Sequence, residues 1–410
     1  MHLTHLSMTN FRSFARLDMD IPRRVVLLTG SNAQGKTSVL EAVYFLAAFT
    51  SFQTHADRHL VNFLEAKKEL AVGRLVAEYT RGLSKHRLEV RLVLEAVGAT
   101  SQRLRKEILL DGVKRSLSEV IGHFNAVIFV PQMVQIIEGG PEERRRYLNL
   151  ALAQTVPGYA HLLSEYGQAL TQRNALLKLL AERGGDQSQL DFWDETITRT
   201  GATIILRRIE AVHEIEKMAA RIHRDLTQGA EVLRIHYQPA YDPLPAPNGQ
   251  IAMPLRTTVQ RNGFSVEDIR LGYALALKNN RAEEIRRGVT VLGPHRDELR
   301  FLANGIDLSD FGSRGQARTT LLALKLAEIE WMKIRTGQWP VLLLDEVLAE
   351  LDTQRRLDLL ASLDKIEQAL LTTTDLKLFS PAFVEKAEKW EVSSGTVKVR
   401  EAGKEGEDVR

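Results

Sequence analysis

The first 130 residues mostly have the hydrophobic pattern of strands. Residues Leu88 to Leu94 largely alternate between apolar and charged side chains, which is typical of a strand with one exposed face. The continuous apolar run Val25 to Leu28 indicates a buried strand instead. Ser38 to Phe49 have the spacing of an amphipathic helix. We therefore expect strands arranged around one helix over this part of the chain.

A helical period begins at Pro141. Proline is favoured at the first position of a helix, and Glu142 and Glu143 suit a first turn. The pattern to about residue 228 predicts two helices separated by Gly184 and Gly185. Their apolar residues, three or four positions apart, are Tyr159, Leu162, Tyr166, Leu170, Leu177 and Leu180, then Phe192, Ile197, Ile204, Ile209, Val212, Ile215 and Ile222. Folded back on each other, they form a short arm and no long coiled coil.

The patterns after this arm are mixed. Five prolines between Pro239 and Pro254 predict an exposed loop. Ser265 is a suitable N-cap for a helix to about Arg287. Asn304-Gly305 predicts a hairpin through which the chain returns to its first domain. The charged residues from Gly395 onward predict a short strand and a disordered tail.

Composition restricts the class of protein. The chain has 410 residues, 44% of them hydrophobic, which is enough for a sizeable core. It contains no cysteine, so disulfides and thiolate metal sites are excluded and a reducing cytoplasm is the expected location. We find neither a signal-peptide pattern nor an apolar run of about 18 residues, and therefore expect neither secretion nor a membrane partner.

The net charge of +3 is too small to indicate a nucleic-acid partner by itself. Basic residues are clustered, however. One group surrounds the predicted turn at Asp111-Gly112, and Arg144, Arg145 and Arg146 follow in the first turns of the predicted helix after Pro141. Arginines at this density suit phosphate contacts, so the triplet is a candidate DNA-binding segment; a solvated helix face is the alternative.

The strongest motif lies between the apolar run at Val25 and the helix that follows. It has the form G-x-x-x-x-G-K-T and comprises Gly30, Ser31, Asn32, Ala33, Gln34, Gly35, Lys36 and Thr37. Strand, loop and helix in this order form a P-loop, whose backbone N–H groups surround phosphates. We predict that the chain binds a nucleoside triphosphate, with Lys36 at the β- and γ-phosphates and Thr37 holding Mg²⁺. We expect Lys36 to be exposed.

A second acidic motif supports this interpretation. The apolar run Val341 to Leu344 ends in Asp345 and Glu346, the form of a Walker B strand. Asp345 is predicted to hold Mg²⁺ together with Thr37. Glu346 is predicted to act as the general base toward the attacking water. An ordinary helix cap is the alternative, which the P-loop disfavours.

Two further segments complete a recognisable order. Ser313, Gly315 and Gln316 form S-x-G-Q before a long helical pattern, and Asp352 ends an E-L-D segment after the Walker B motif. The chain thus has four motifs in succession: P-loop, S-x-G-Q, L-L-L-D-E and E-L-D. This order resembles the ABC-type ATPase superfamily. The resemblance implies that the signature segment of one subunit contacts the γ-phosphate bound by another, which suits a helix N-terminus.

Motifs along nearly the whole chain resemble the bacterial RecF recombination-repair family. They are M-T-N-F-R-S-F at residues 8–14, F-V-P-Q at 129–132, G-G-P-E-E-R-R-R-Y-L at 139–148, Q-R-N at 172–174, G-P-H-R-D at 293–297 and T-T-T-D at 372–375. The resemblance implies an ATP-dependent homodimer that binds single-stranded gaps and junction DNA. It also implies weak DNA-stimulated ATPase activity and RecA loading with RecR-type and RecO-type mediators.

The expected fold is therefore α/β: an ABC/SMC-type P-loop ATPase head with an inserted, mainly helical lobe. We assign residues 1–130 and 289–410 to the head and 131–288 to the lobe. An ABC transport subunit is one alternative, but Thr372 to Asp375 stand where transporters carry a switch histidine. A nucleotide-regulated defence ATPase is the other, although no nuclease carboxylate cluster is evident.

Overall fold

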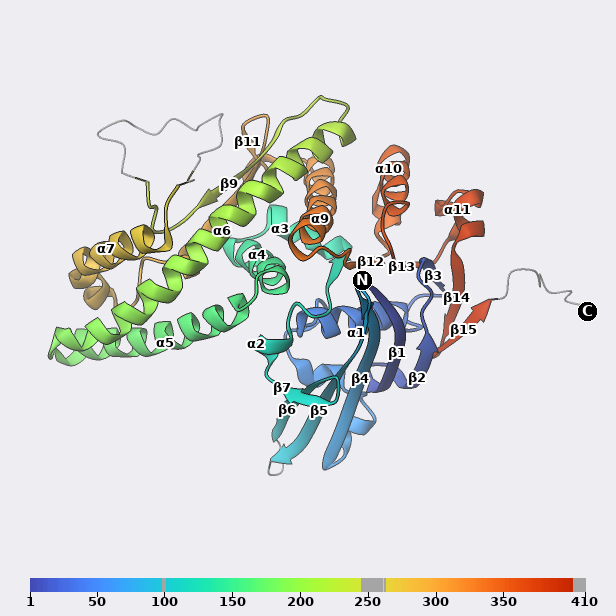
Figure 1. Ribbon diagram of the computed structural model, residues 1–410, viewed down its shortest axis with the longest axis horizontal. Coiled ribbons are helices and arrows are strands. Elements are labelled where there is room, and N and C mark those ends of the chain that lie inside the picture. The colour runs from blue at the N-terminus through green and yellow to red at the C-terminus, as the bar shows by residue number, and fades with distance from the viewer. Residues whose placement is uncertain (98–100, 245–260, 262, 401–410) are drawn as a thin grey trace, which may run out of the picture. The chain divides into compact units, whose positions relative to one another are not determined.

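The computed structural model describes residues 1–97, 101–244, 261 and 263–400. They belong to two compact units (Figure 1). Unit 1 comprises Met1–Gln132 and Met332–Arg410, and unit 2 comprises Met133–Trp331. The second boundary thus falls at 331/332, whereas the sequence suggested 288/289. Most of the predicted proline-rich loop and the last ten residues lie outside the described ranges.

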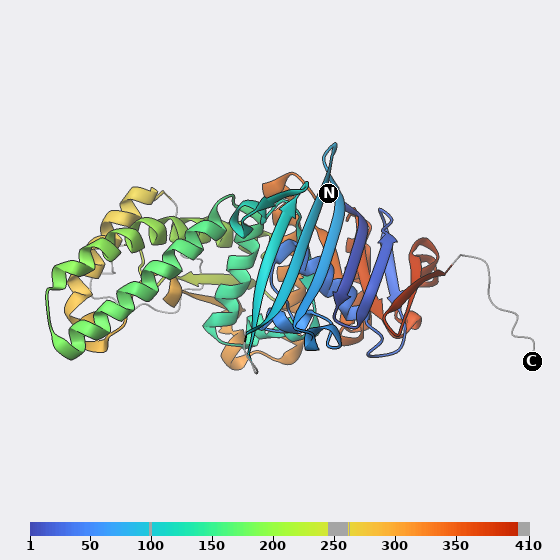
Figure 2. The same ribbon diagram turned by 90° about the horizontal axis from the view of Figure 1, so that it is seen from below.

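Unit 1 contains a six-stranded antiparallel sheet in the order β2-β1-β4-β5-β6-β7. Figure 2 shows its strands side by side. The β6–β7 hairpin turns at Asp111-Gly112, as predicted. The strands are β1 (His2–Phe11), β2 (Phe14–Asp20), β4 (Leu70–Arg81), β5 (Ser84–Val97), β6 (Ser101–Leu110) and β7 (Val113–Arg115), followed by the short helix α2 (Leu117–Val120).

Strand β5 differs from the half-exposed strand that its alternation predicted. Glu89 is buried rather than exposed. Its carboxylate accepts hydrogen bonds from Arg74 Nε at 2.8 Å and Arg91 Nε at 2.7 Å. These bonds hold the pKa of Glu89 down at about 2, mainly through Arg74. The charged residue Glu89 is therefore buried and ion-paired, although the alternating pattern predicted that it is exposed.

The second sheet of unit 1 has the order β15-β14-β3-β13-β12-β8. Strands β14, β3, β13, β12 and β8 are parallel, and β15 is antiparallel to β14. Parallel strands end at the same edge, so β3 and β12 bring the P-loop and the Walker B acids together. The elements are β3 (Val25–Thr29), β8 (Ala126–Phe129), β12 (Val341–Asp345), α10 (Thr353–Leu363), β13 (Ala369–Thr373), α11 (Pro381–Lys386), β14 (Glu388–Ser393) and β15 (Thr396–Arg400).

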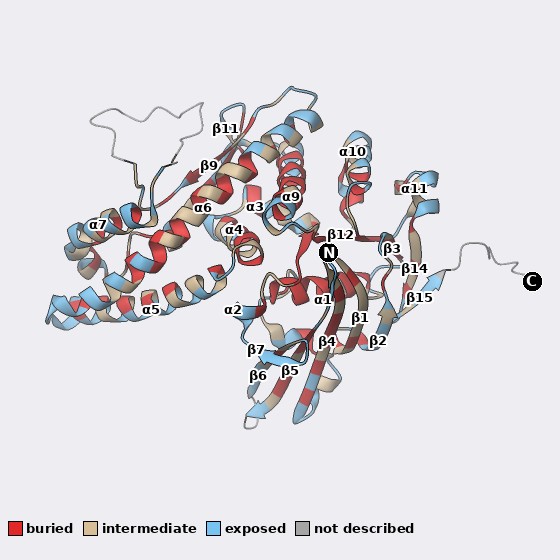
Figure 3. Cartoon of the chain, viewed as in Figure 1, coloured by how far each residue is buried: buried red, intermediate tan, exposed pale blue. Residues whose placement is uncertain are grey.

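Helix α1 (Lys36–Ala48) lies between the two sheets and contacts strands of both. The sequence suggested an amphipathic helix, but α1 is buried on nearly all sides from Val39 onward (Figure 3). A helix covered on two faces by sheets has no solvent side to favour polar residues. Consequently Glu41 is fully buried and needs the partner described below.

Unit 2 is mainly helical. Helices α5 and α6 pack along each other as the predicted arm, with the break between them at Gly184. Ser265 caps α7 through a capping box with Asp268, also as predicted. Its helices are α3 (Gln135–Glu138), α4 (Pro141–Thr155), α5 (Tyr159–Arg183), α6 (Leu190–Leu226), α7 (Val266–Arg287), α8 (Leu308–Phe311) and α9 (Arg314–Thr336), the last of which extends into unit 1.

The hairpin at Asn304-Gly305 forms between β10 (Glu298–Ala303) and β11 (Ile306–Asp307). It does not return the chain to unit 1. β10 pairs along its whole length with β9 (Leu233–Gln238), the strand that follows α6, and so belongs to unit 2. This long-range pairing explains why the unit boundary lies later than predicted. Within the described ranges, none of the helices combines the length and apolar character needed to cross a bilayer.

Candidate nucleotide-binding site

The P-loop connects the end of β3 to the start of α1. Gly30 has φ of 145°, and a Cβ atom there would lie 2.3 Å from the carbonyl oxygen of Val392 in β14. Only glycine therefore fits at this turn. The Gln34 side-chain oxygen accepts a hydrogen bond from the Ser394 backbone N–H at 2.7 Å, which ties the loop to the turn after β14. The loop is a preformed, backbone-lined cradle.

Lys36 lies at the centre of this cradle. Its Nζ donates to the carbonyl oxygens of Gly30 at 2.8 Å and Ser31 at 3.1 Å, and lies 3.2 Å from Glu346 Oε1. Only 4% of Lys36 is exposed, so the expectation of an exposed lysine was wrong. The loop carbonyls replace water around the ammonium group and so offset the free-energy cost of burying its charge.

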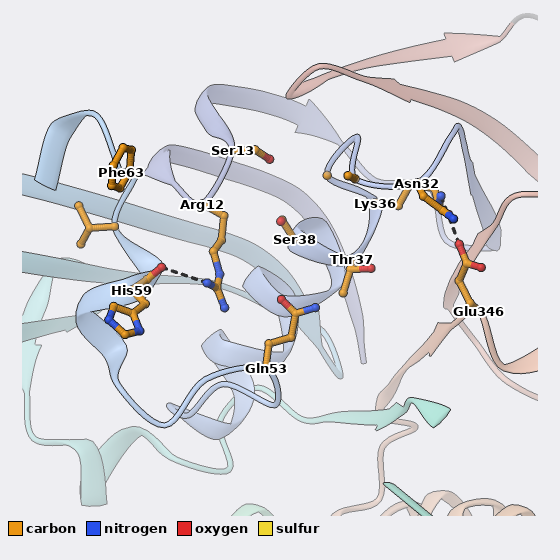
Figure 4. A pocket seen from close by; sticks show the side chains of 13 residues that line it. Arg12, Ser13, Asn32, Lys36, Thr37, Ser38, Gln53, His59, Phe63 and Glu346 are labelled. Carbon is orange, nitrogen blue, oxygen red and sulfur yellow. Dashed lines mark hydrogen bonds and ion pairs between the residues drawn. The ribbon is translucent and has the colours of Figure 1, made fainter. Parts of the chain in front are cut away.

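A cavity of about 700 Å³ opens over the loop (Figure 4). Its lining includes Asn32, Ala33, Gly35, Lys36 and Thr37 of the predicted motif. It also includes Glu346 from the end of β12, so both ATPase motifs face the same space. Gly30, Ser31 and Gln34 of the motif are not among the lining residues.

Asp345 and Thr37 are in direct contact. The Thr37 hydroxyl donates to Asp345 Oδ1 at 2.9 Å, and the Thr372 hydroxyl from β13 donates to the same oxygen at 2.7 Å. Burial raises the pKa of Asp345, and these two hydrogen bonds oppose the rise. A cation beside this carboxylate would favour its ionised form.

Glu346 has a left-handed backbone conformation with φ of 54°, which is uncommon outside glycine. Its N–H donates to the Thr372 hydroxyl oxygen at 3.0 Å. Thr372 thus bonds both acids at the end of β12, while the Glu346 side chain faces Lys36. Strained residues of this kind are held by their surroundings and are frequent at functional sites.

These features fit Mg²⁺ and a nucleoside triphosphate. The glycine cradle excludes a Cβ atom, and a lysine ammonium and backbone N–H groups suit phosphate oxygens. A threonine hydroxyl next to a carboxylate is an oxygen donor set that Mg²⁺ prefers. Thr37 and Asp345 are the residues that would hold the metal.

The signature segment belongs to unit 2. The Ser313 hydroxyl accepts from Gln316 N at 3.2 Å, and Ser313 N donates to Gln316 Oε1 at 2.9 Å, so the two form a capping box at the start of α9. Gln316 Nε2 also donates to Glu231 at 2.8 Å. Ser313 and Gly315 are exposed. The segment is thus an ordered, accessible helix start.

Asp352, of the predicted E-L-D segment, caps α10 in unit 1. Its carboxylate accepts the Arg355 N–H at 3.0 Å and pairs with the Arg355 guanidinium. The hydrogen bond from Arg355 N holds the pKa of Asp352 below its usual range. Nucleotide contact by Ser313, Gly315, Gln316 and Asp352 stays a prediction.

Comparison with known proteins identifies the family. The family model described as "RecF/RecN/SMC N terminal domain" matches residues 2–395. The DNA replication and repair protein RecF of Exiguobacterium sp. is 35% identical over 400 residues, with 97% of this chain and 99% of that protein covered. The RecF of Herpetosiphon aurantiacus is 36% identical over 407 residues, with the same coverage. The chain belongs to the RecF family.

Solved structures agree with this assignment. A structure described as the recombination mediator protein RecF-ATP in the RecFOR pathway is 28% identical, has a TM-score of 0.81 and covers 98% of both chains. Its RecF-ATPrS counterpart has a TM-score of 0.80 and covers 97% of this chain and 98% of that one. An Smc head domain from Pyrococcus furiosus, 15% identical with a TM-score of 0.50, shares the fold. The expected head ATPase fold is thereby confirmed.

The arginine triplet of this RecF-family chain does not form one surface. Arg144 is only 5% exposed, and its guanidinium donates to both carboxylate oxygens of Glu298 at 2.7 and 2.9 Å. This geometry does not fit the predicted DNA contact for Arg144, because the guanidinium is used inside unit 2. Arg145 and Arg146 are half-buried, and their contact with DNA stays a prediction.

The basic residues around the β6–β7 turn are largely paired with acids. Lys106 contacts Asp57, and Arg115 lies 3.5 Å from Glu119. Arg105 and Lys114 both approach Glu107. Their positive charge is therefore compensated locally, which favours a structural role for most of this group.

Two residues in or next to the cavity lining had no role assigned from the sequence. Arg12, in the turn between β1 and β2, lines the cavity and donates to both oxygens of buried Glu41 at 2.7 and 2.6 Å. Thr372 bridges the two Walker B acids. Both belong to motifs that carry the family resemblance, but motif membership does not reveal which atoms meet.

Proposed function

We propose that this RecF-family chain is an ATP-dependent DNA-binding recombination-repair factor of the cytoplasm. It binds ATP in the cavity over the P-loop, dimerises on ATP and holds single-stranded gaps and junctions in DNA. The observation that carries the proposal is that Lys36, Thr37 and Glu346 line one cavity, with Asp345 hydrogen-bonded to Thr37. The RecF structures described with ATP support the choice of nucleotide.

Each of these side chains has a distinct task in the proposed site. The Lys36 ammonium exchanges its loop carbonyl partners for β- and γ-phosphate oxygens, which it neutralises. Thr37 and Asp345 would hold Mg²⁺, which would offset the negative charge of the phosphates. Glu346 orients the attacking water and accepts its proton. Because Glu346 also faces Lys36, nucleotide binding has to separate this pair before the carboxylate acts as a base.

The proposed dimer places the Ser313 segment of one copy against the γ-phosphate held by the other. An exposed hydroxyl that accepts one hydrogen bond keeps its own hydrogen for an anion, and the start of α9 adds a partial positive charge. Asp352 follows the Walker B segment and is proposed to lie at the same interface. ATP then holds the two heads together, and weak, DNA-stimulated hydrolysis releases them.

The relatives' solved structures are described as recombination mediators in the RecFOR pathway. By this likeness we propose RecR-type and RecO-type mediators as partners and RecA loading as the outcome.

The deciding experiment measures ATP-dependent dimerisation and retention of gapped DNA by the purified chain. Light scattering gives the dimer and filter binding gives the complex, each with and without Mg-ATP. Wild type should show both only with Mg-ATP. Lys36→Ala should show neither, because it lacks the phosphate-facing charge, and circular dichroism checks its fold. Lys365→Ala, which removes an exposed lysine of unit 1 away from the cavity, should behave as wild type.

ATP-dependent dimers and DNA retention by Lys36→Ala would refute the proposed nucleotide site. Dimers without DNA retention in wild type would refute the DNA-binding role alone.

A further inference from the structure

Two motifs that the ATPase site does not use meet inside unit 2. The arginine triplet lies on α4, and G-P-H-R-D forms the short 3-10 helix Pro294–Arg296 and its flanks, about 150 residues later. Arg145, Arg146, Pro294 and His295 line one cavity of about 440 Å³. Its other walls come from α5 and α6, which pack against α4 (Figure 1). We refer to this cavity as the α4–α5 groove.

The wall formed by G-P-H-R-D is rigidly built. Gly293 has φ of 124°, and a Cβ atom there would lie 2.0 Å from the Tyr273 hydroxyl oxygen. His295 Nδ1 lies 2.7 Å from the Tyr166 hydroxyl, and its Nε2 lies 3.1 Å from the Thr290 carbonyl oxygen. Because several contacts fix this segment, it holds the residues beside it in place.

A buried ion pair stabilises the same wall. Arg208 and Asp297 are 2% and 1% exposed, and Arg208 Nη1 donates to Asp297 Oδ2 at 2.5 Å. Arg208 also donates to the Pro294 carbonyl oxygen at 2.6 Å and to Asn149 at 2.9 Å. Asp297 further accepts the Ala240 N–H at 2.9 Å and the Tyr237 hydroxyl. The negative charge of Asp297 is thus compensated by Arg208 and by hydrogen bonds within the wall.

The lining of the groove has an excess of positive charge. It includes three arginines, Arg145, Arg146 and Arg208, and one acidic residue, Glu142. Arg145 uses Nη1 to donate to the Asp297 backbone oxygen at 2.8 Å. Burial and the nearby Arg208 lower the pKa of Arg145, so the surroundings of this side chain disfavour its charged form. An added anion would offset this cost.

The apolar part of the lining is mainly aliphatic. It comprises Leu150, Leu163, Leu170 and Ile204, whereas Tyr166 is only 4% exposed and its hydroxyl lies 2.7 Å from His295 Nδ1. Single-stranded nucleic acid is bound by accessible aromatic faces and a continuous basic track. Aliphatic side chains next to arginines are instead typical of protein interfaces.

We propose that the α4–α5 groove binds an acidic segment of a protein partner. One apolar side chain of that segment contacts the aliphatic lining residues, and an adjacent carboxylate pairs with Arg145. Arginine suits this role because its planar guanidinium matches a carboxylate in two parallel hydrogen bonds. The site goes beyond the proposed ATPase function, and ATP binding does not depend on it.

Gly167 provides a sharp test, because it lines the groove and a Cβ atom there would meet nothing within 4 Å. Gly167→Leu fills the groove and also favours helix α5. Ser164→Leu adds the same bulk to an exposed position of α5 outside the lining. Arg145→Glu reverses one charge of the groove lining, and Arg183→Glu makes the same change at the exposed end of α5.

The experiment selects a displayed library of random 12-residue peptides on the full-length wild type and measures the enriched peptides by fluorescence anisotropy. We expect enrichment of Asp or Glu beside Leu, Ile, Met or Phe. Affinity should fall about tenfold or more for Gly167→Leu and for Arg145→Glu. Ser164→Leu and Arg183→Glu should bind as wild type, and ATP binding should be unchanged in all four variants.

Enriched peptides that bind all variants equally, or that are basic, would overturn the proposal, as would a selection that enriches nothing. A 5′-phosphorylated single-stranded oligonucleotide is measured alongside. If its binding, and not that of the peptides, is lost in Gly167→Leu and Arg145→Glu, the groove is a nucleic-acid site and the proposal fails.

Discussion

At the scale of single residues, the nucleotide site depends on a few short contacts. Thr372 bonds both Asp345 and the Glu346 backbone, so the two acids at the end of β12 have fixed but different surroundings. Asp345 is half-buried beside Thr37, whereas Glu346 faces the cavity. We propose different roles for the two acids, metal binding for Asp345 and proton transfer for Glu346, and the two roles can be tested separately.

Glu346→Gln should lower ATP hydrolysis by about 10² or more while Mg-ATP binding persists, because it removes the base and keeps the side chain's size. The variant should accumulate as an ATP-bound dimer on DNA. Asp345→Asn should lower both occupancy and turnover, because it weakens the metal site. Single-turnover hydrolysis and sizing in ATP distinguish the two, with Glu385→Gln on exposed α11 as the control. Wild-type hydrolysis by Glu346→Gln would remove Glu346 from the mechanism.

His295 makes a pH-dependent contribution to the stability of unit 2. Burial lowers its pKa to about 4, below the usual value near 6.5, so the folded state prefers the neutral ring. Its contribution is complete above pH 6.5 and is lost as the pH falls toward 4. The loss is at most about 3 kcal/mol.

Thermal unfolding between pH 7 and 4.5 measures this effect. The stability of wild type should fall more steeply than that of His295→Gln, which has no ring to protonate. His161→Gln, at an exposed position of α5, should retain the wild-type slope. Equal slopes for wild type and His295→Gln would show that His295 titrates normally.

At the scale of elements, helix starts provide several of the candidate functional positions. α1 begins at the P-loop, α10 at Asp352 and α9 at the Ser313 capping box. Each start presents backbone N–H groups and a partial positive charge. At α9 the cap and the predicted signature are compatible, because capping orders the segment while leaving Ser313 exposed.

Ser313→Arg tests the signature segment. ATP binding by the monomer should remain near the wild-type value, because Ser313 belongs to a different unit from the P-loop. ATP-driven dimerisation should be abolished, because the bulky cation would occupy the position proposed for the partner's nucleotide. Light scattering over a concentration series measures this. Ser164→Arg, on α5, should dimerise as wild type, and dimers of Ser313→Arg at wild-type concentrations would exclude the signature role.

At the scale of the whole molecule, the residues that line the nucleotide cavity all belong to unit 1, and those of the α4–α5 groove all belong to unit 2. Ligand binding at one should therefore stabilise its own unit first. A ligand at 100 times its Kd adds about 2.7 kcal/mol of stability.

Hydrogen exchange of monomeric protein with saturating Mg-ATP tests this division. Amides of β3, α1 and β12 should gain protection, because local opening there would release the nucleotide. Amides of α5 should be unchanged at a protein concentration below dimerisation. Lys36→Ala should show no ATP-dependent change anywhere. Protection gained in α5 but not in α1 would place the nucleotide elsewhere.

Much of this protein follows from sequence alone, for local reasons. A P-loop depends on glycine conformations and adjacent residues, so Gly30 to Thr37 and their strand and helix are recognisable without a structure. The arm helices, the hairpin turns and the Ser265 cap are likewise set by periodicity and by the residues at their ends. Motif order then sufficed to identify the family, and with it the head ATPase fold.

What depends on distant contacts needed the tertiary structure. The pattern of α1 could not show that sheets cover both its faces, nor could β10 show that it pairs with β9 and so extends unit 2. Arg144 looks like its neighbours in the sequence, yet Glu298, 154 positions away, takes its guanidinium. Lys36 is buried because loop carbonyls fold over it. Burial and charge pairing are properties of packed neighbours, and sequence spacing does not encode which neighbours those are.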